Sequence, residues 1–319
     1  MRFSTLFTFV ATAVLTSAGP IRVARQAAPV DPSLGFLTIL ELGAAGFYTG
    51  LLQSFNASDY QASGFADGQA VFDIVNTITN SEITHLTFLQ TLSGAPLPNC
   101  TLDFSPAYAD PVTGLATARV LELAAIGAYV GVIASDTISN NTEVFAEIMG
   151  NEASHEGFLN MLLGGDPFPQ SFELGITPAE ILTLLLPFNP SCTPALTLTP
   201  NTPLTITNSG PITNTTTLTF DLSSTPCANQ SGLFCQLLSG DDSSAAALPI
   251  ANCTLEGTSG ALLTYVTTDS TPISADPLQR GNLTNLCAGP AVTFVDPAVI
   301  PPLDALLLQP APTAANSTA

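Results

Sequence analysis

The chain has little positive charge and few of the side chains that commonly build binding sites. Its 319 residues include no lysine, five arginines, two histidines and no tryptophan, against 25 acidic residues, and the formal net charge at pH 7 is −20. A surface this acidic repels nucleic acids and anionic membranes, and we expect neither as a partner. We interpret the acidity mainly as a means of staying soluble in an acidic medium.

Long apolar runs are also scarce. Residues 1–18 have the pattern of a secretory signal peptide, with a charged Arg2, an apolar stretch over 6–15 and small residues before a cleavage point. That stretch is too short to span a membrane, and we identify no membrane-spanning stretch after it. Residues 19–30 then form a pro-segment or a linker.

Other features fit secretion. Six cysteines are an even number, as expected of a disulfide-bonded protein. Eight N-glycosylation sequons begin at Asn56, Asn99, Asn140, Asn214, Asn229, Asn252, Asn282 and Asn316. We therefore expect a secreted glycoprotein of the extracellular space or the cell wall.

Composition divides the chain near Pro190. Before it the sequence is rich in Ala, Leu and Gly with helical periodicity, and after it Thr, Ser, Pro and Val alternate. We predict an α+β protein: a four-helix bundle with a short fifth helix over 31–190, a small β-sandwich over 191–300, and a flexible tail over 301–319.

Helix caps place the predicted helices. Asp31-Pro32 and Asp110-Pro111 each combine an N-cap residue with proline at the first helical position. Thr177 begins a capping box that Glu180 completes. The predicted helices cover residues 31–55, 67–93, 110–136 and 142–163, followed by the short fifth helix from 177. The longest link, residues 95–112, is a candidate crossover connection.

Both histidines stand three residues after a glutamate. These pairs are Glu82 with His85 and Glu152 with His155. Positions i and i+3 share one face of a helix, so each pair directs a carboxylate and an imidazole at the same place. The chain has only ten glutamates, which makes the double coincidence improbable by chance.

The same region is internally repeated. Glu41 and Glu122 lie in similar segments 81 residues apart, and the two Glu-x-x-His segments lie 70 residues apart. Each glutamate falls near the middle of an apolar helix, so the four would meet at one level of a bundle. Four buried carboxylates need protons or cations, and two divalent metal ions would balance their charge. Each ion would take one His, one terminal Glu and oxygens of shared glutamates, which suits iron or manganese.

This pattern resembles the ferritin-like di-metal carboxylate proteins, in which two helices supply Glu and two supply Glu-x-x-His. The metal ligands that the resemblance implies are Glu41, Glu82, His85, Glu122, Glu152 and His155. With its secretion signal, fifth helix and β-rich extension, the chain is similar to fungal ferritin-like proteins linked to stress response, late sexual development and desiccation. The added domain and the many sequons count against a closed storage shell.

Other residues of the helical half have less specific roles. Tyr48 and Tyr129 each lie seven residues after a candidate ligand glutamate, two turns along the same face. They can donate a hydrogen bond at the metal centre or relay electrons, although we favour plain core packing. We interpret Glu143, Glu147 and Glu156 as surface charges.

The β-rich half offers little chemistry. We predict strands at 196–199, 204–207, 217–221, 262–267 and 291–295. It contains no histidine, which excludes a copper site of the His-Cys-Met type. We interpret this half as a structural or adhesive module that binds cell-wall or extracellular components. Cys100 and Cys192 can pair to tie the crossover to the end of the bundle, and for the rest we favour Cys227–Cys235 and Cys253–Cys287, although spacing does not fix connectivity.

Two functions remain open from the sequence. The first is a secreted protein with a dinuclear iron or manganese site, acting in metal-dependent oxidation, peroxide handling or metal binding. The alternative is a non-catalytic cell-wall or stress-associated protein whose bundle is only a scaffold. The sequence determines neither the substrate nor the oligomeric state.

Overall fold

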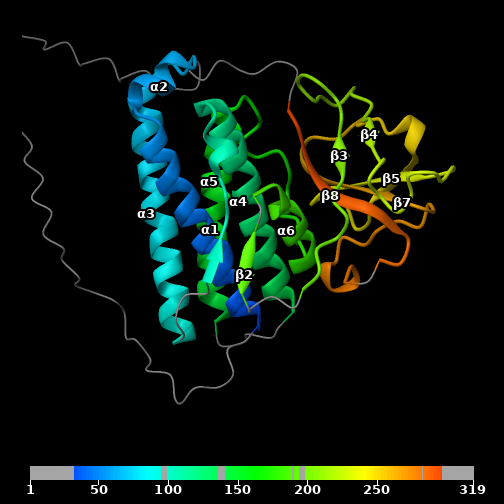
Figure 1. The fold of residues 1–319 in the computed structure, drawn as a ribbon, viewed down its shortest axis with the longest axis horizontal. Coiled ribbons are helices and arrows are strands. Elements are labelled where there is room, and N and C mark those ends of the chain that lie inside the picture. The colour runs from blue at the N-terminus through cyan, green and yellow to red at the C-terminus, as the bar shows by residue number, and fades with distance from the viewer. Residues whose placement is uncertain are drawn as a thin grey trace, which may run out of the picture.

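We analysed a computed structural model, which describes residues 32–94, 99–135, 141–188, 190–193, 198–281 and 283–296. The expected signal peptide, the pro-segment or linker, the tail and the expected cap Asp31 lie outside these ranges. Figure 1 shows a bundle of long helices with a strand-rich part packed along one side of it. The α+β organisation is as predicted.

The four long helices lie where the sequence predicts them. They are α1 (Pro32–Ser54), α3 (Gly68–Ser93), α4 (Pro111–Ala134) and α5 (Thr142–Leu162). The carboxylate of Asp110 caps α4 by accepting from the backbone N–H of Thr113 at 2.9 Å. Gly94 ends α3 in the left-handed conformation, with φ of 60°. The short α2 (Ala57–Ala62) is not predicted by the sequence; Asn56 caps it.

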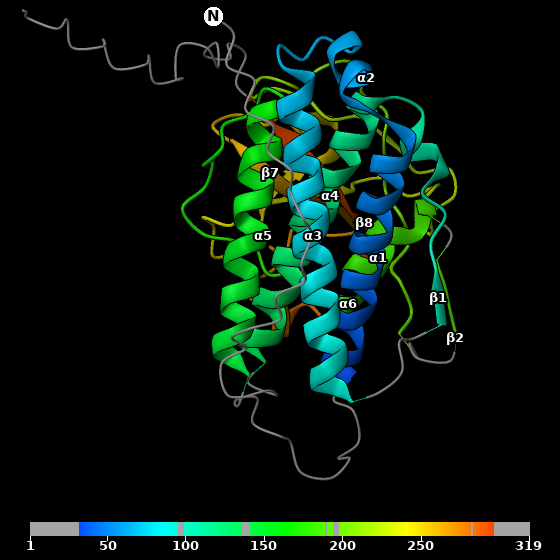
Figure 2. The ribbon, with the colours of Figure 1, turned by 90° about the vertical axis from the view of Figure 1, so that its left-hand side faces the viewer.

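The helices form two antiparallel hairpins joined by a crossover. Helix α1 packs on α3 and on α4, and α4 packs on α5. The crossover carries β1 (Asn99–Thr101) and η1 (Ser105–Tyr108), and Figure 2 shows β1 and β2 along the side of the bundle. By length and composition alone α1 and α4 are apolar enough to cross a membrane, and 56% and 67% of their apolar windows are buried in the protein.

The crossover is tied to the end of the helical half. Strand β1 pairs antiparallel with β2 (Ser191–Thr193), which follows α6 (Pro178–Leu185) and η2 (Leu186–Phe188). Cys100 lies directly opposite Cys192 in this register and is disulfide-bonded. The backbone therefore has the register that the expected pairing of these cysteines requires.

The strand-rich part contains a four-stranded antiparallel sheet of order β6-β5-β7-β8 and a separate β3–β4 pair. Its elements are β3 (Thr205–Ile206), β4 (Phe220–Asp221), β5 (Phe234–Leu238), β6 (Ala246–Pro249), η3 (Ile250–Asn252), β7 (Gly260–Thr267), η4 (Pro277–Gln279) and β8 (Leu286–Val295). Strands β3, β4, β7 and β8 overlap predicted strands, whereas β5 and β6 were missed. Of the expected strand over 196–199, residues 196 and 197 lie outside the described ranges, and 198 and 199 form no strand.

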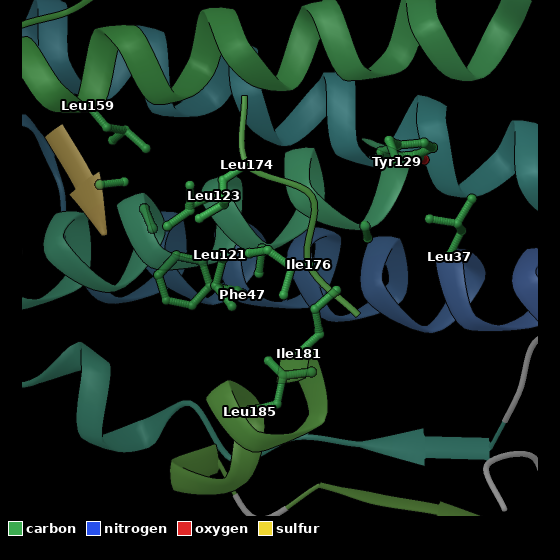
Figure 3. Packing of buried hydrophobic residues seen from close by; sticks show 14 of the residues in the cluster. Leu37, Phe47, Leu121, Leu123, Tyr129, Leu159, Leu174, Ile176, Ile181 and Leu185 are labelled. Carbon is green, nitrogen blue, oxygen red and sulfur yellow. The ribbon is translucent and has the colours of Figure 1, made fainter. Parts of the chain in front are cut away.

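The sheet and the bundle share one hydrophobic core. All eight residues of the central strand β7 are buried. Leu263 and Tyr265 join the core of the bundle, while Leu262 faces a smaller cluster on the other side of the sheet. Figure 3 shows Ile181 and Leu185 of α6 directed toward the helices that carry Phe47 and Leu121. The composition change near Pro190 therefore marks a change of secondary structure within a continuous core.

The disulfides of the strand-rich part differ from the expected pairs. Cys227 pairs with Cys287, and Cys235 pairs with Cys253. Cys235 and Cys253 lie in one small hydrophobic cluster, and Cys227 and Cys287 lie in another. The predictions Cys227–Cys235 and Cys253–Cys287 are wrong because neighbours in sequence enter different clusters.

Two buried arginines fasten the strand-rich part to the helices. Arg119 of α4 donates to Asp296 at 2.7 and 3.0 Å, and its guanidinium lies 3.8 Å from the ring centroid of Phe294. Arg280 donates to Glu180 of α6 at 3.0 Å, and Tyr265 donates to the same carboxylate at 2.7 Å. Glu180 also completes the predicted capping box with Thr177. These are the two basic residues of the chain beyond Arg25.

Removing one partner of the Arg280–Glu180 pair should strongly destabilise the protein. In Arg280→Ala the carboxylate of Glu180 loses its cation while remaining buried, and we expect unfolding to become easier by about 3–5 kcal/mol. Chemical denaturation checks this. Glu143→Ala, an exposed change on α5, should alter stability by less than about 0.5 kcal/mol. Equal stability of the two variants would contradict the assigned role of the pair.

Candidate metal centre

The structure brings together all six residues proposed as ligands from the sequence. Helix α1 supplies one glutamate, α4 supplies another, and α3 and α5 each supply a Glu-x-x-His pair. Each is at most 8% exposed. We call this group the central cluster; its members are Glu41, Glu82, His85, Glu122, Glu152 and His155.

The two imidazoles face the carboxylates through the same ring nitrogen. Nδ1 of His85 lies 2.8 Å from Glu152 and 3.6 Å from Glu41. Nδ1 of His155 lies 3.2 Å from Glu82, 3.4 Å from Glu122 and 3.5 Å from Glu152. The rings are stacked with centroids 6.3 Å apart. Both Nδ1 atoms therefore point into a space ringed by carboxylate oxygens.

The central cluster divides into two overlapping groups whose donor atoms lie within 4.8 Å of one another. One contains Glu41 and His85, the other contains Glu122 and His155, and both contain Glu82 and Glu152. Exchanging each residue for its repeat counterpart converts one group into the other. The internal repeat therefore produces two equivalent positions that share two carboxylates.

The two tyrosines connect the halves of this arrangement. The hydroxyl of Tyr48 on α1 donates to Oε1 of Glu122 on α4, and that of Tyr129 on α4 donates to Oε1 of Glu41 on α1. Burial and the adjacent carboxylate raise the pKa of each phenol well above 10, so both stay protonated and donate. Core packing, the interpretation favoured from sequence, misses these bonds; the 81-residue spacing shared with the glutamates is the signal that could have found them.

The donor atoms left over are the reason to consider a metal. Nine buried side-chain atoms in the described ranges have no hydrogen-bond partner, and eight of them belong to the central cluster. They are Oε2 of Glu41 and of Glu122, both oxygens of Glu82 and of Glu152, and Nδ1 of His85 and of His155. Native proteins rarely leave so many buried polar atoms unpaired in one place. Oxygen and imidazole donors in this arrangement fit divalent metal ions.

Electrostatics show how strained the carboxylates are without a cation. Burial, reinforced by the charge of Glu152, raises the pKa of Glu41 from 4.5 to about 8. The same two causes raise the pKa of Glu82 and, more strongly, of Glu122. Burial also acts to raise the pKa of Glu152, but its contacts with the two imidazoles outweigh it and lower the value to about 2.

The imidazoles are shifted in the opposite sense. Burial lowers the pKa of both rings, but the surrounding carboxylates outweigh it and raise the pKa to about 10 for His85 and about 12 for His155. Without metal at neutral pH, the cluster therefore balances its charge with protons on both imidazoles and on Glu41.

Comparison with protein families agrees with this geometry. Residues 33–165 match the family model of the ferritin-like domain. The helical half of the chain contains a ferritin-like domain. The match spans α1 to α5 and includes every member of the central cluster. A search of curated proteins found no match to the chain.

One sequence interpretation near the ferritin-like site is wrong. Glu143 and Glu147 are exposed as expected, but Glu156 is only 6% exposed. Segment 165–173 and strand β7 approach this face of α5, which the sequence of the helix alone does not reveal. Sequence reasoning also missed Arg119 and Asn160, which are hydrogen-bonded to each other through Nε and Oδ1.

Removing either tyrosine hydroxyl should have the same effect. Tyr48→Phe and Tyr129→Phe each leave one buried carboxyl oxygen unpaired, and we expect each to lower the unfolding free energy of the metal-free protein by about 1–3 kcal/mol. Tyr60→Phe is the matched control, because the buried hydroxyl of Tyr60 has no hydrogen-bond partner. Its stability should be unchanged or slightly higher. A loss as large in Tyr60→Phe would show that the hydroxyl bonds to Glu122 and Glu41 are not the cause.

Proposed function

We propose that the ferritin-like domain binds two divalent iron or manganese ions and that the protein acts in metal-dependent oxidation, peroxide handling or metal binding. The observation that carries the proposal is the set of eight buried, unpaired donor atoms in the central cluster. Carboxylate and imidazole donors without thiolate favour iron or manganese. Such ions would supply one-electron oxidation and reduction at a site closed off from bulk water.

The proposed ligand roles follow the two groups. Glu41 and His85 would be terminal ligands on one side, and Glu122 and His155 on the other. Glu82 and Glu152 would be shared. Because each tyrosine already occupies Oε1 of a terminal glutamate, Oε2 is the oxygen left to bind. Four ionised carboxylates and two divalent ions sum to zero charge, which removes the repulsion described above.

We also propose that the protein works outside the cell, in the extracellular space or the cell wall. The disulfides Cys227–Cys287 and Cys235–Cys253 support this, since such bonds persist in oxidising compartments. A role in stress or development follows from the resemblance alone. Engagement of wall components by the strand-rich part is part of the same proposal.

Metal stoichiometry tests the shared and terminal roles separately. After anaerobic reconstitution with Fe²⁺ or Mn²⁺, wild type should bind about two ions per chain. Glu82→Ala should lose both, because its carboxylate belongs to both groups. Glu41→Ala should weaken one ion more than the other, since this residue belongs to one group. Elemental analysis after desalting measures the retained metal.

Glu147→Ala is the control, because Glu147 is an exposed carboxylate on α5, the helix that carries Glu152 and His155. It should bind as much metal as wild type. If wild type binds no more metal than Glu82→Ala, the di-metal proposal fails, and the alternative of a non-catalytic scaffold stands.

Metal binding should release protons and tighten as the pH rises. Bound ligands must be deprotonated, whereas the metal-free cluster holds protons on the imidazoles, with pKa values of about 10 and 12, and on Glu41, with a pKa of about 8. Each proton released per ion should weaken binding about tenfold for every unit by which the pH falls below these values. Titration with Mn²⁺ in a weakly buffered solution under a pH-stat measures the release. Binding without proton release would place the metal elsewhere.

A further inference from the structure

A second site lies outside the central cluster, where α5 meets the strand-rich part. A cavity of about 210 Å³ is bounded by Glu156 and Gly157 of α5, by the segment around Phe168, by Glu173 and by Ala261 of β7. It lies on a different face of α5 from the side that carries Glu152 and His155. Nothing in the proposed metal chemistry uses it.

The wall of this cavity is held in place by the sheet. Gln170 donates from its side-chain amide to the backbone oxygens of Ser259 at 3.2 Å and Ala261 at 2.7 Å. The hydroxyl of Ser259 donates to the backbone oxygen of Pro169 at 3.1 Å. Asp241 accepts from the backbone N–H of Ser171 at 2.7 Å. The cavity is therefore formed in advance of any ligand.

Two carboxyl groups line the cavity. Glu156 is 6% exposed, and within the described ranges its side chain makes neither a hydrogen bond nor an ion pair. Glu173 is exposed and lies on the solvent side of the same cavity. A buried carboxylate that has no partner is costly, so its place beside an open cavity points to a ligand that supplies the missing charge.

The protein has no cation of its own to supply that charge. The nearest basic side chain is that of Arg119, but its guanidinium already donates to Asn160 and, in a bidentate pair, to Asp296. Its flat face is covered by the ring of Phe294. Arg280, the other basic residue beyond Arg25, is bonded to Glu180.

We propose that this cavity binds a small organic cation, a primary ammonium or guanidinium group on a short apolar stem. The cationic head would pair with Glu156 and Glu173. The stem would contact the apolar part of the lining, which includes Leu123, Ala153 and Phe168. Phe168 is 84% exposed at the rim and offers its ring to a cation.

The lining favours an organic cation over a metal ion. Calcium takes about six to eight oxygen ligands. Within the described ranges, the groups of three or more acidic, histidine or cysteine residues that could hold an ion are those of the central cluster. The volume also lies below the about 300–1,000 Å³ of sites for drug-sized ligands, so the cavity fits a small amine or one basic side chain. The amine can be a free metabolite or the Lys or Arg side chain of another protein.

Calorimetric titration of the purified full chain tests the proposal. The probes are n-butylammonium chloride for a free amine, and a peptide acetyl-Gly-Lys-Gly-amide for a side chain; n-butanol is the uncharged control. We expect saturable binding of at least one cationic probe and none of n-butanol. Glu156→Gln and Glu173→Gln should each weaken it at least tenfold, and Glu143→Gln on the exposed face of α5 should not change it. Binding should weaken as NaCl is added.

The outcomes separate the ligand sources and can overturn the proposal. Binding of n-butylammonium indicates a free amine, and binding of the peptide alone indicates a basic side chain. Glu173 is exposed, so its variant remains informative even if Glu156→Gln folds poorly. Absence of saturable binding by both cationic probes, equal binding in both cavity variants, or displacement of the amine by submillimolar CaCl₂ would overturn it. Titrations of metal-free and reconstituted protein should agree, so failure here leaves the di-metal proposal untouched.

Discussion

The charge balance of the central cluster constrains the rest of the bundle. Four carboxylates sit between apolar helices, where each unpaired charge costs several kcal/mol. The helices must therefore hold them in positions where protons or cations can be shared. The two imidazoles supply part of the balance, and the tyrosine hydroxyls orient the terminal glutamates. Eight donor atoms still lack partners, and this surplus is difficult to explain in a bundle that serves only as a scaffold.

The internal repeat makes this constraint easier to satisfy. Glu41 and Tyr48 on α1 are related to Glu122 and Tyr129 on α4 by the same 81 residues, so one pair of bonds is made twice in opposite directions. The crossover between the two helical hairpins lets α1 and α4 lie side by side in the antiparallel sense that these crossing bonds need. Loss of either helix would therefore leave carboxyl groups unpaired on the other.

The sequence predicts local structure well and contacts between distant segments poorly. Asp110 as a cap and the i, i+3 spacing of Glu82 and His85 are local features, and both predictions agree with the structure. Strand β5 was missed because both of its faces are covered, which removes the alternation that marks a half-buried strand. The disulfides failed for a related reason, since Cys235 and Cys227 point into clusters that form only once the sheet has assembled.

The burial of Glu156 extends the same point to function. A helix position with polar and small neighbours indicates a surface, yet residues 165–173 and β7 enclose this one. The chain has two basic residues beyond Arg25, and both lie in the contact between the helices and the sheet, each already paired with a carboxylate. Its other buried carboxyl groups, in the central cluster and beside the cavity on α5, must therefore stay protonated or take cations from outside. An acidic protein that uses its few cations to join its two parts in this way leaves two separate buried sites for external cations.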